Sequence, residues 1–163
     1  MATVHKNLSH YDATDIPDAS EMTIAIVVSE WNKKITNGLL NGTTRTLKNH
    51  GLKEDNLTIH NVPGSFELPS AAQFILESKK NIDAVICLGC VIQGETKHFD
   101  FVCQGITKGV VDVSLKYNKP VIFGVLTDNT LQQSNDRSGG KHGNKGDEAA
   151  IAAIKMVQLK RNI

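Results

Sequence analysis

The residues with the clearest chemical potential lie together in the segment Gly94-Glu95-Thr96-Lys97-His98, which is predicted to lead into a helix. Backbone N–H groups at a helix start can hold an anion, and the Thr96 hydroxyl would add a donor. Histidine side chains titrate near neutral pH, so His98 can carry a proton between reacting groups. A lone histidine is more often a structural residue, but one beside an anion site is a candidate acid–base group. The segment therefore predicts a bound phosphate next to a proton-transfer residue.

Two earlier segments carry residues that could hold a flat or hydroxyl-bearing ligand. Trp31 precedes a predicted helix and lies among charged residues, so it either packs in the core or stacks on a planar ring. In the segment 62–70 (VPGSFELPS), Gly64 would let a ligand approach the backbone. Glu67 either accepts hydrogen bonds from ligand hydroxyls or only complements the start of a helix. The spacing alone leaves these alternatives open.

A basic, glycine-rich segment follows the last predicted strand. Arg137, Lys141 and Lys145 recur every fourth residue around the sequence SGGKHGNKG, residues 138–146. The segment lacks the GK[ST] signature of a nucleotide-binding P-loop. It is either a solvated connection or a phosphate site in which Arg137 makes two parallel hydrogen bonds. Taken with residues 94–98, it indicates a small phosphorylated substrate.

Cys87, Cys90, Cys103 and His98 offer four nominal zinc ligands. Cys87 and Cys90 lie three residues apart on a predicted strand, so their side chains point to opposite faces. A zinc knuckle needs both sulfurs at one turn. We therefore expect buried, unreactive cysteines and no metal. Three cysteines cannot all pair within one chain, and the polar N-terminus has no cleavable signal, so a reducing cytoplasm is the expected location.

Composition limits the class of protein. The chain has 163 residues, enough for one domain, with 40% hydrophobic and 21% charged residues, as is typical of a globular fold. A formal net charge of +1 argues against a nucleic-acid partner. No apolar run approaches the roughly 20 residues that a membrane helix needs, so no membrane partner is expected.

Apolar patterns predict the elements that carry these segments. Strands are expected over residues 22–28, 57–62, 84–92 and 120–126, and helices over 33–49, 67–80, 99–117 and 147–161. Strands that alternate with helices imply right-handed crossovers and a parallel sheet covered on both faces. The predicted fold class is α/β, a three-layer sandwich with a four-stranded, mainly parallel sheet and flavodoxin-like topology.

Residues 22–163 are predicted to form one domain, preceded by an N-terminal arm, residues 1–21, that could add an extra strand. Asn32 would cap the first helix, and Gly51 would end it. Ligand sites in parallel sheets lie at the carboxyl ends of the strands. The segments described above all follow predicted strands, so we expect them to meet at one edge of the sheet.

Several of these segments together resemble a known family. The motifs WN (31–32), VPGSFELP (62–69), LGCVIQGETKHFDFV (88–102) and DRSGGKHGNKG (136–146), the last preceded by PVIFGVLT (120–127), occur in this order. From about residue 23 to residue 159 the chain resembles the lumazine synthases. The resemblance implies condensation of 5-amino-6-(D-ribitylamino)uracil with 3,4-dihydroxy-2-butanone 4-phosphate to 6,7-dimethyl-8-ribityllumazine, phosphate and water. This is the penultimate step of riboflavin biosynthesis, and it implies no metal or organic cofactor.

The resemblance also implies roles for individual residues. Trp31 takes the aromatic position that stacks on the pyrimidine, usually a Phe in the family, and His98 takes the proton-transfer position. The ring and the ribityl chain are expected at Asn32, Ser65, Phe66, Glu67, Cys90, Val91 and Ile92, with Phe123 and Lys145 supplied by a neighbouring subunit. The phosphate is expected at Glu95, Thr96 and Arg137.

Assembly is a further implication of the resemblance. Members of the family are pentamers, often built into a 60-subunit icosahedral shell, and their product links them functionally to riboflavin synthase. The glycine-rich segment resembles that of shell-forming members. Two alternatives stay open: a flavodoxin-like module that binds a flavin or a nucleotide without catalysis, and a structural shell without turnover.

Overall fold

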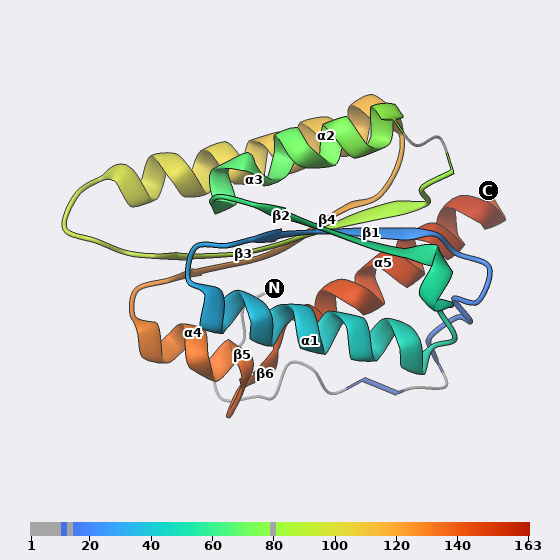
Figure 1. Cartoon of the computed structure of the whole chain (residues 1–163), viewed down its shortest axis with the longest axis horizontal. Helices are drawn as coiled ribbons and strands as arrows, with labels where there is room; N and C mark the ends of the chain where they lie inside the picture. Colours follow the sequence, from blue (N-terminus) through green and yellow to red (C-terminus); the bar gives the residue numbers. More distant parts are fainter. Residues whose placement is uncertain (1–10, 13–14, 79–80) are drawn as a thin grey trace.

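A central sheet of four parallel strands organises the chain (Figure 1). The computed structural model describes residues 11–12, 15–78 and 81–163. The strands lie in the order β2-β1-β3-β4, with bounds β1 (Ile24–Ser29), β2 (Leu57–Val62), β3 (Ala84–Ile92) and β4 (Val121–Asp128). Each neighbouring pair is parallel. The predicted α/β, flavodoxin-like architecture is confirmed.

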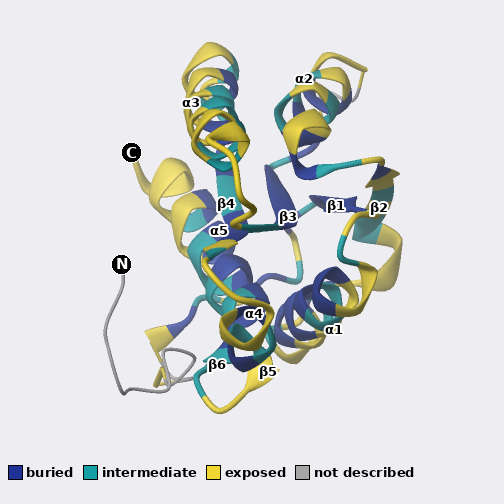
Figure 2. Ribbon diagram, turned by 90° about the vertical axis from the view of Figure 1, so that its left-hand side faces the viewer, coloured by how far each residue is buried: buried dark blue, intermediate teal, exposed yellow. Residues whose placement is uncertain are grey.

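Helices cover both faces of this sheet (Figure 1). They are α1 (Lys33–Asn49) and α5 (Lys145–Asn162) on one face, and α2 (Leu68–Ser78) and α3 (His98–Tyr117) on the other. Each face has its own apolar cluster, because successive side chains of a strand point to opposite sides. In β1, Ile24 and Ile26 belong to the cluster under α1 and α5, whereas Ala25 and Val27 belong to the other. Figure 2 shows the buried strands β1 and β3 between the two helical layers.

The segment between β4 and α5 is more regular than the predicted loop. It contains α4 (Leu131–Arg137) and an antiparallel pair of short strands, β5 (Ser138–Gly140) and β6 (Gly143–Asn144). A capping box starts α4, in which the Thr130 side chain accepts a hydrogen bond from Gln133 N and the Gln133 side chain accepts one from Thr130 N. The T-x-x-Q spacing that signals this cap was present in the sequence.

Two 3-10 turns complete the order of elements: η2 (Glu54–Asn56) precedes β2, and η3 (Ser65–Glu67) precedes α2. The helix predicted from residue 67 therefore opens with a tighter turn before α2 begins at Leu68. Among the helices in the described ranges, none combines the length and the apolar character that crossing a membrane requires.

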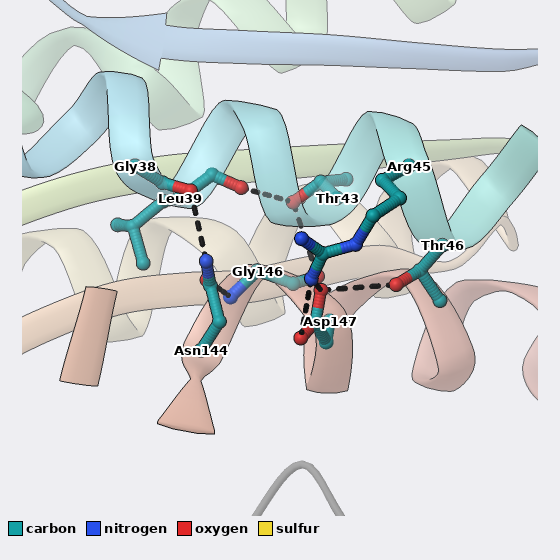
Figure 3. A network of polar contacts seen from close by, with 8 residues as sticks. All are labelled: Gly38, Leu39, Thr43, Arg45, Thr46, Asn144, Gly146 and Asp147. Atoms are coloured by element: carbon teal, nitrogen blue, oxygen red, sulfur yellow. Dashed lines mark hydrogen bonds and ion pairs between the residues drawn. The ribbon is translucent and has the colours of Figure 1, made fainter. Parts of the chain in front are cut away.

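The start of α5 is anchored to α1 by buried polar contacts (Figure 3). Asn144 Nδ2 donates to Gly38 O at 2.9 Å, and Thr43 Oγ1 donates to Gly146 O at 3.0 Å. Gly146 permits this close approach, because a Cβ there would lie 2.1 Å from Leu39 O. Asn144 also caps α5, since its Oδ1 accepts from Gly146 N at 2.8 Å. The helix therefore begins at Lys145, two residues before the predicted start.

Part of the predicted N-terminal arm belongs to the packed domain. Ile16 and Ala19 are buried in the cluster under α1 and α5. Ala19 N donates to His50 O at 2.7 Å, and the Arg161 guanidinium donates to Glu21 O at 2.8 Å. Two apolar side chains are enough to cover this edge of the core, although they are too few to form a periodic pattern. The rest of the arm, residues 1–10 and 13–14, and with it the suggested extra strand, lies outside the described residues.

Candidate active site

A cavity of about 440 Å³ opens beside the carboxyl ends of β1, β2 and β3. Its volume suits a small organic ligand. The loops that follow these three strands and the first turns of α3 supply its walls, as expected for a parallel sheet. The lining consists of Trp31, Asn32, Gly64, Ser65, Phe66, Glu67, Cys90, Val91, Ile92, Gly94, Thr96, His98, Phe99 and Val102.

The cavity therefore brings together most of the predicted site residues. Trp31, His98 and Thr96 line it together with the whole predicted set from Ser65 to Glu67 and from Cys90 to Ile92. The lining contributed by the described residues does not include Glu95, Phe123, Arg137 or Lys145. Phe99 and Val102 line the cavity without having been among the predicted contacts. Val102 follows His98 by four residues on α3, a spacing that places both on one face of the helix.

The backbone of Cys90 holds two loops together beneath the cavity. Cys90 N donates to Ser65 Oγ at 3.2 Å, and Asn32 Nδ2 donates to Cys90 O at 3.0 Å. Asn32 has the left-handed backbone angles φ 58° and ψ 44°, and its side chain makes no capping hydrogen bond to α1. Asn32 therefore stands at the predicted N-cap position, and its carbonyl accepts from Thr36 N at 3.1 Å, but its side chain does not cap the helix. Its short side chain tolerates this conformation and joins the end of β1 to the end of β3 instead.

Two aromatic side chains form exposed walls. Trp31 is 72% exposed and Phe66 is 58% exposed, so neither belongs to the core. Of the two interpretations of Trp31, core packing is wrong, and a platform available for a planar ring fits the structure. The Phe66 ring packs against α3 at Gly105, where an added Cβ would lie 2.6 Å from Phe66 Cε2. The absence of a side chain at Gly105 lets the ring lie against the helix.

The start of α3 differs slightly from the prediction. The helix begins at His98, one residue before the predicted start, and Thr96 Oγ1 accepts a hydrogen bond from His98 N at 3.3 Å. The Thr96 hydroxyl keeps its own proton for donation. Thr96 and His98 are both exposed at the cavity. A helix of 20 residues starts here, and its dipole and free N–H groups favour an anion at this end.

A second cluster of charged residues lies at the junction of α4 and α5. Glu148 holds both predicted cations: the Arg137 guanidinium donates to Glu148 Oε1, and Lys145 Nζ lies 3.1 Å from Glu148 Oε2. Arg137 also donates to His142 O at 2.6 Å. Lys141 pairs separately with Asp136. Sequence reasoning missed Glu148, although its position three residues after Lys145 on a helix predicts a contact between the two.

The cysteines behave as predicted on β3. Cys87 belongs to the apolar cluster under α2 and α3, and Cys90 belongs to the opposite cluster. Burial raises the pKa of the Cys87 thiol to about 12 and also raises the pKa of Cys90. Both are free and buried, whereas Cys103 is only half-buried. The two sulfurs on β3 therefore lie on opposite faces of the sheet, as the three-residue spacing requires.

Comparison with known proteins gives a consistent answer. Residues 21–161 match the family model described as 6,7-dimethyl-8-ribityllumazine synthase. A protein of that name from Parabacteroides distasonis is 57% identical over 98% of this chain and 99% of its own length. Proteins of the same name are similarly close in two other organisms. The one from Cytophaga hutchinsonii is 55% identical over 96% of this chain and 98% of its own length, and the one from Flavobacterium johnsoniae is 56% identical over 99% of this chain and 84% of its own length. The chain belongs to the lumazine synthase family.

Family membership confirms the resemblance that the motifs carried. The match spans the whole domain from β1 to α5, so it includes every loop that lines the cavity. A non-catalytic flavin- or nucleotide-binding module is not favoured. Four of the predicted site residues lie outside the cavity lining: Glu95 in the loop before α3, Phe123 on β4, Arg137 on α4 and Lys145 on α5.

Proposed function

We propose that this chain is a transferase that condenses 5-amino-6-(D-ribitylamino)uracil with 3,4-dihydroxy-2-butanone 4-phosphate to 6,7-dimethyl-8-ribityllumazine, phosphate and water. This reaction is the penultimate step of riboflavin biosynthesis. One observation carries the proposal: in a chain of this family, one cavity combines an exposed aromatic side chain, Trp31, with the N-terminal end of α3 and with His98. These are the groups that a planar substrate, a phosphate and a series of proton transfers require.

The pyrimidine substrate binds in the part of the cavity between Trp31 and Phe66. Trp31 stacks on the ring, and Glu67 accepts hydrogen bonds from the ribityl hydroxyls. Asn32 and Ser65, held by the Cys90 backbone, contact the ring edge and the ribityl chain. Val91 and Ile92 extend the same wall and are half-buried.

The phosphate of the second substrate binds at the start of α3. The Thr96 hydroxyl and the backbone N–H of Glu95 and of its neighbours donate to it, and the helix dipole adds attraction. Glu95 is exposed, so its negative charge is not buried beside the phosphate. Arg137 completes this phosphate site from a neighbouring subunit, because it lies outside the cavity of its own chain. A guanidinium suits a phosphate because it offers parallel donors.

His98 transfers protons during the reaction. The 5-amino group attacks the ketone and forms an imine with loss of water, and loss of a carbon-bound proton then drives the departure of phosphate. A second attack by the ribityl-bearing nitrogen, again with loss of water, closes the ring. Each step moves a proton, which an imidazole can accept and return near neutral pH. Holding two substrates in a reactive orientation can itself supply about 7–11 kcal/mol, so His98 assists a reaction that positioning already accelerates.

The working unit is an assembly of copies of this chain. Phe123, Arg137 and Lys145 complete the cavity of a neighbouring subunit in a pentamer, and pentamers assemble further into a 60-subunit icosahedral shell. The product passes to riboflavin synthase. The cytoplasm is the location we propose, in keeping with the three free cysteines. Light scattering that finds only monomers would overturn the assembly.

Mixing the two substrates with the purified chain tests the activity directly. We expect lumazine fluorescence to appear and inorganic phosphate to be released in equal amounts. A tightly bound yellow cofactor with no product would instead favour a flavin-binding module. A large assembly without turnover would favour a structural shell.

A further inference from the structure

A chain of hydrogen bonds runs behind the cavity from Cys90 to the end of β4. The Cys90 thiol donates to Ser134 Oγ, with 3.4 Å between sulfur and oxygen, and Ser134 Oγ donates to Asp128 Oδ2 at 2.7 Å. The three residues come from β3, α4 and β4. Ser134 is 0% exposed and Cys90 is 1% exposed, so little water competes for these bonds. Neither Ser134 nor Asp128 is among the described residues that line the cavity.

The direction of this chain is fixed by the number of protons available. A serine hydroxyl has one proton to donate, and Ser134 gives it to the Asp128 carboxylate at the shorter of the two distances. Ser134 can therefore only accept from Cys90, which must remain a protonated thiol. Burial raises the pKa of Cys90, and the negative charge of Asp128 adds to that rise, whereas hydrogen bonding with Ser134 and Asn32 opposes it; the pKa stays raised overall, which favours the same state.

Asp128 is itself held on more than one side. Its backbone oxygen accepts from Gln93 N at 2.9 Å, which ties the end of β4 to the residue after β3. Burial raises the pKa of its carboxyl group, while the hydrogen bond from Ser134 and the charge of Arg137 lower it. The ionised carboxylate thus depends on its Ser134 partner, because a half-buried charge without a hydrogen bond is costly.

The thiol at the other end belongs to the residue that holds the pyrimidine site. The Cys90 backbone bonds Asn32 on one side and Ser65 on the other. The ladder between β3 and β4 holds the Cys90 backbone, and the thiol adds an anchor to α4 through Ser134. A shift at Cys90 would therefore move two substrate-contacting side chains together.

We propose that Ser134 and Asp128 are positioning residues for the pyrimidine substrate, acting through Cys90. This role rests on the proposed function, in which Asn32 and Ser65 contact that substrate. The two residues hold Cys90, near the carboxyl end of β3, in the position that aims Asn32 and Ser65 at the ligand, and neither touches a reacting atom.

Ser134→Ala tests the role with little change in volume. We expect its KM for the ribitylaminouracil, and its calorimetric Kd for the same compound, to rise about fivefold, as the loss of one buried hydrogen bond implies. The KM for the butanone phosphate should stay within about twofold of wild type, because the Thr96 end of the cavity is untouched. Ser114→Ala is the matched control: Ser114 Oγ donates to Lys119 O at 2.8 Å near the end of α3, and its loss should leave both KM values unchanged.

Raman spectroscopy of the thiol supplies a readout that general destabilisation does not move. The S–H stretching band of Cys90, assigned by difference from Cys90→Ala, should shift in Ser134→Ala toward the position of an unbonded thiol. Asp128→Asn should cause a smaller shift in the same direction, with a smaller rise in KM, because a neutral amide oxygen is a weaker acceptor than a carboxylate. This second variant decides the matter if Ser134→Ala fails to fold.

Three results would overturn the proposal: a wild-type affinity for the ribitylaminouracil in the folded variants, an S–H band that stays in place, or an equal loss of affinity for both substrates. A wild-type chain that binds the ribitylaminouracil but forms no lumazine would contradict the proposed function alone. The Kd of the variants would still test the positioning role.

Discussion

Gly89 is the position at which one added methyl group should disturb the site most directly. A Cβ at Gly89 would lie 2.5 Å from Ser65 Oγ and 2.9 Å from Leu68 Cδ1. Non-bonded carbon atoms are normally about 3.5–4.0 Å apart, so Gly89→Ala requires Ser65 to move by roughly 1 Å. The backbone at Gly89 has no positive φ, so crowding is the dominant effect.

The displacement of Ser65 should reach the substrate. Ser65 Oγ accepts from Cys90 N at 3.2 Å, and a shift of that size takes the bond beyond hydrogen-bond range. We expect Gly89→Ala to lower the free energy of unfolding by about 1–3 kcal/mol through overpacking. We also expect its KM for the ribitylaminouracil to rise by as much as about 100-fold, the effect that a 1 Å misplacement can have.

Two glycine variants separate the site effect from overpacking. In Gly109→Ala the new Cβ would meet Pro69 Cβ and Cγ at 2.8 Å, between α2 and α3 and away from the cavity lining. We expect crowding at this contact to lower the free energy of unfolding of Gly109→Ala, with a gain in helix propensity of about 1 kcal/mol offsetting part of the loss. Its KM for the ribitylaminouracil should equal that of the wild type. Gly94→Ala meets no atom within 4 Å, so its unfolding free energy should match wild type.

Urea unfolding followed by circular dichroism gives the stability of each variant, and steady-state kinetics with each substrate varied in turn gives KM. The reasoning fails if Gly89→Ala binds the ribitylaminouracil as the wild type does. It fails equally if Gly109→Ala raises that KM as much as Gly89→Ala, because the effect would then follow from crowding anywhere in the core.

Other predictions concern the charged and nucleophilic groups. His98→Ala should lower kcat by no more than about 100-fold at saturating substrates, the lower end for acid–base catalysis, because orientation remains; an unchanged kcat would remove His98 from the mechanism. Arg137→Ala should raise the KM for the butanone phosphate about tenfold with little change for the other substrate, and no effect on that KM would contradict its assignment. A thiol reagent at pH 8 should modify Cys103 and spare Cys87, whose burial raises its pKa to about 12; rapid modification of Cys87 in the folded chain would contradict its packing.

The fold could be predicted because its signals are local and repeated. Strands buried on both faces read as continuous apolar runs, and β3 is such a run from Ala84 to Ile92. Because a helix connects each strand to the next, the strands must be parallel, and the loops that follow parallel strands all lie at one edge of the sheet. The meeting of Trp31, Ser65 and His98 at one cavity follows from that topology.

The contacts that sequence patterns did not predict join segments that are distant along the chain. Asn32 is a good capping residue by type, yet its amide donates to Cys90 O, on a strand distant in the sequence. Ile16 and Ala19 enter the core as single side chains and leave no periodic pattern. Glu148 gains its importance from Arg137, which α4 brings to it. Sequence spacing within one element does not encode such pairs.

Glu148, which pairs with Arg137 and Lys145, still leaves these two cations able to attract the phosphate that we propose they bind. A guanidinium has five N–H donors, and in the described structure the contacts to Glu148 and His142 account for two of the five. Arg137 and Lys145 carry two positive charges and Glu148 carries one negative charge, so the three side chains together keep a net positive charge. The pairing also holds both long side chains half-buried, with 15% and 22% of their surface exposed. Flexible cations would lose more conformational freedom on binding a phosphate, so Glu148 orients Arg137 for its proposed ligand without neutralising the attraction.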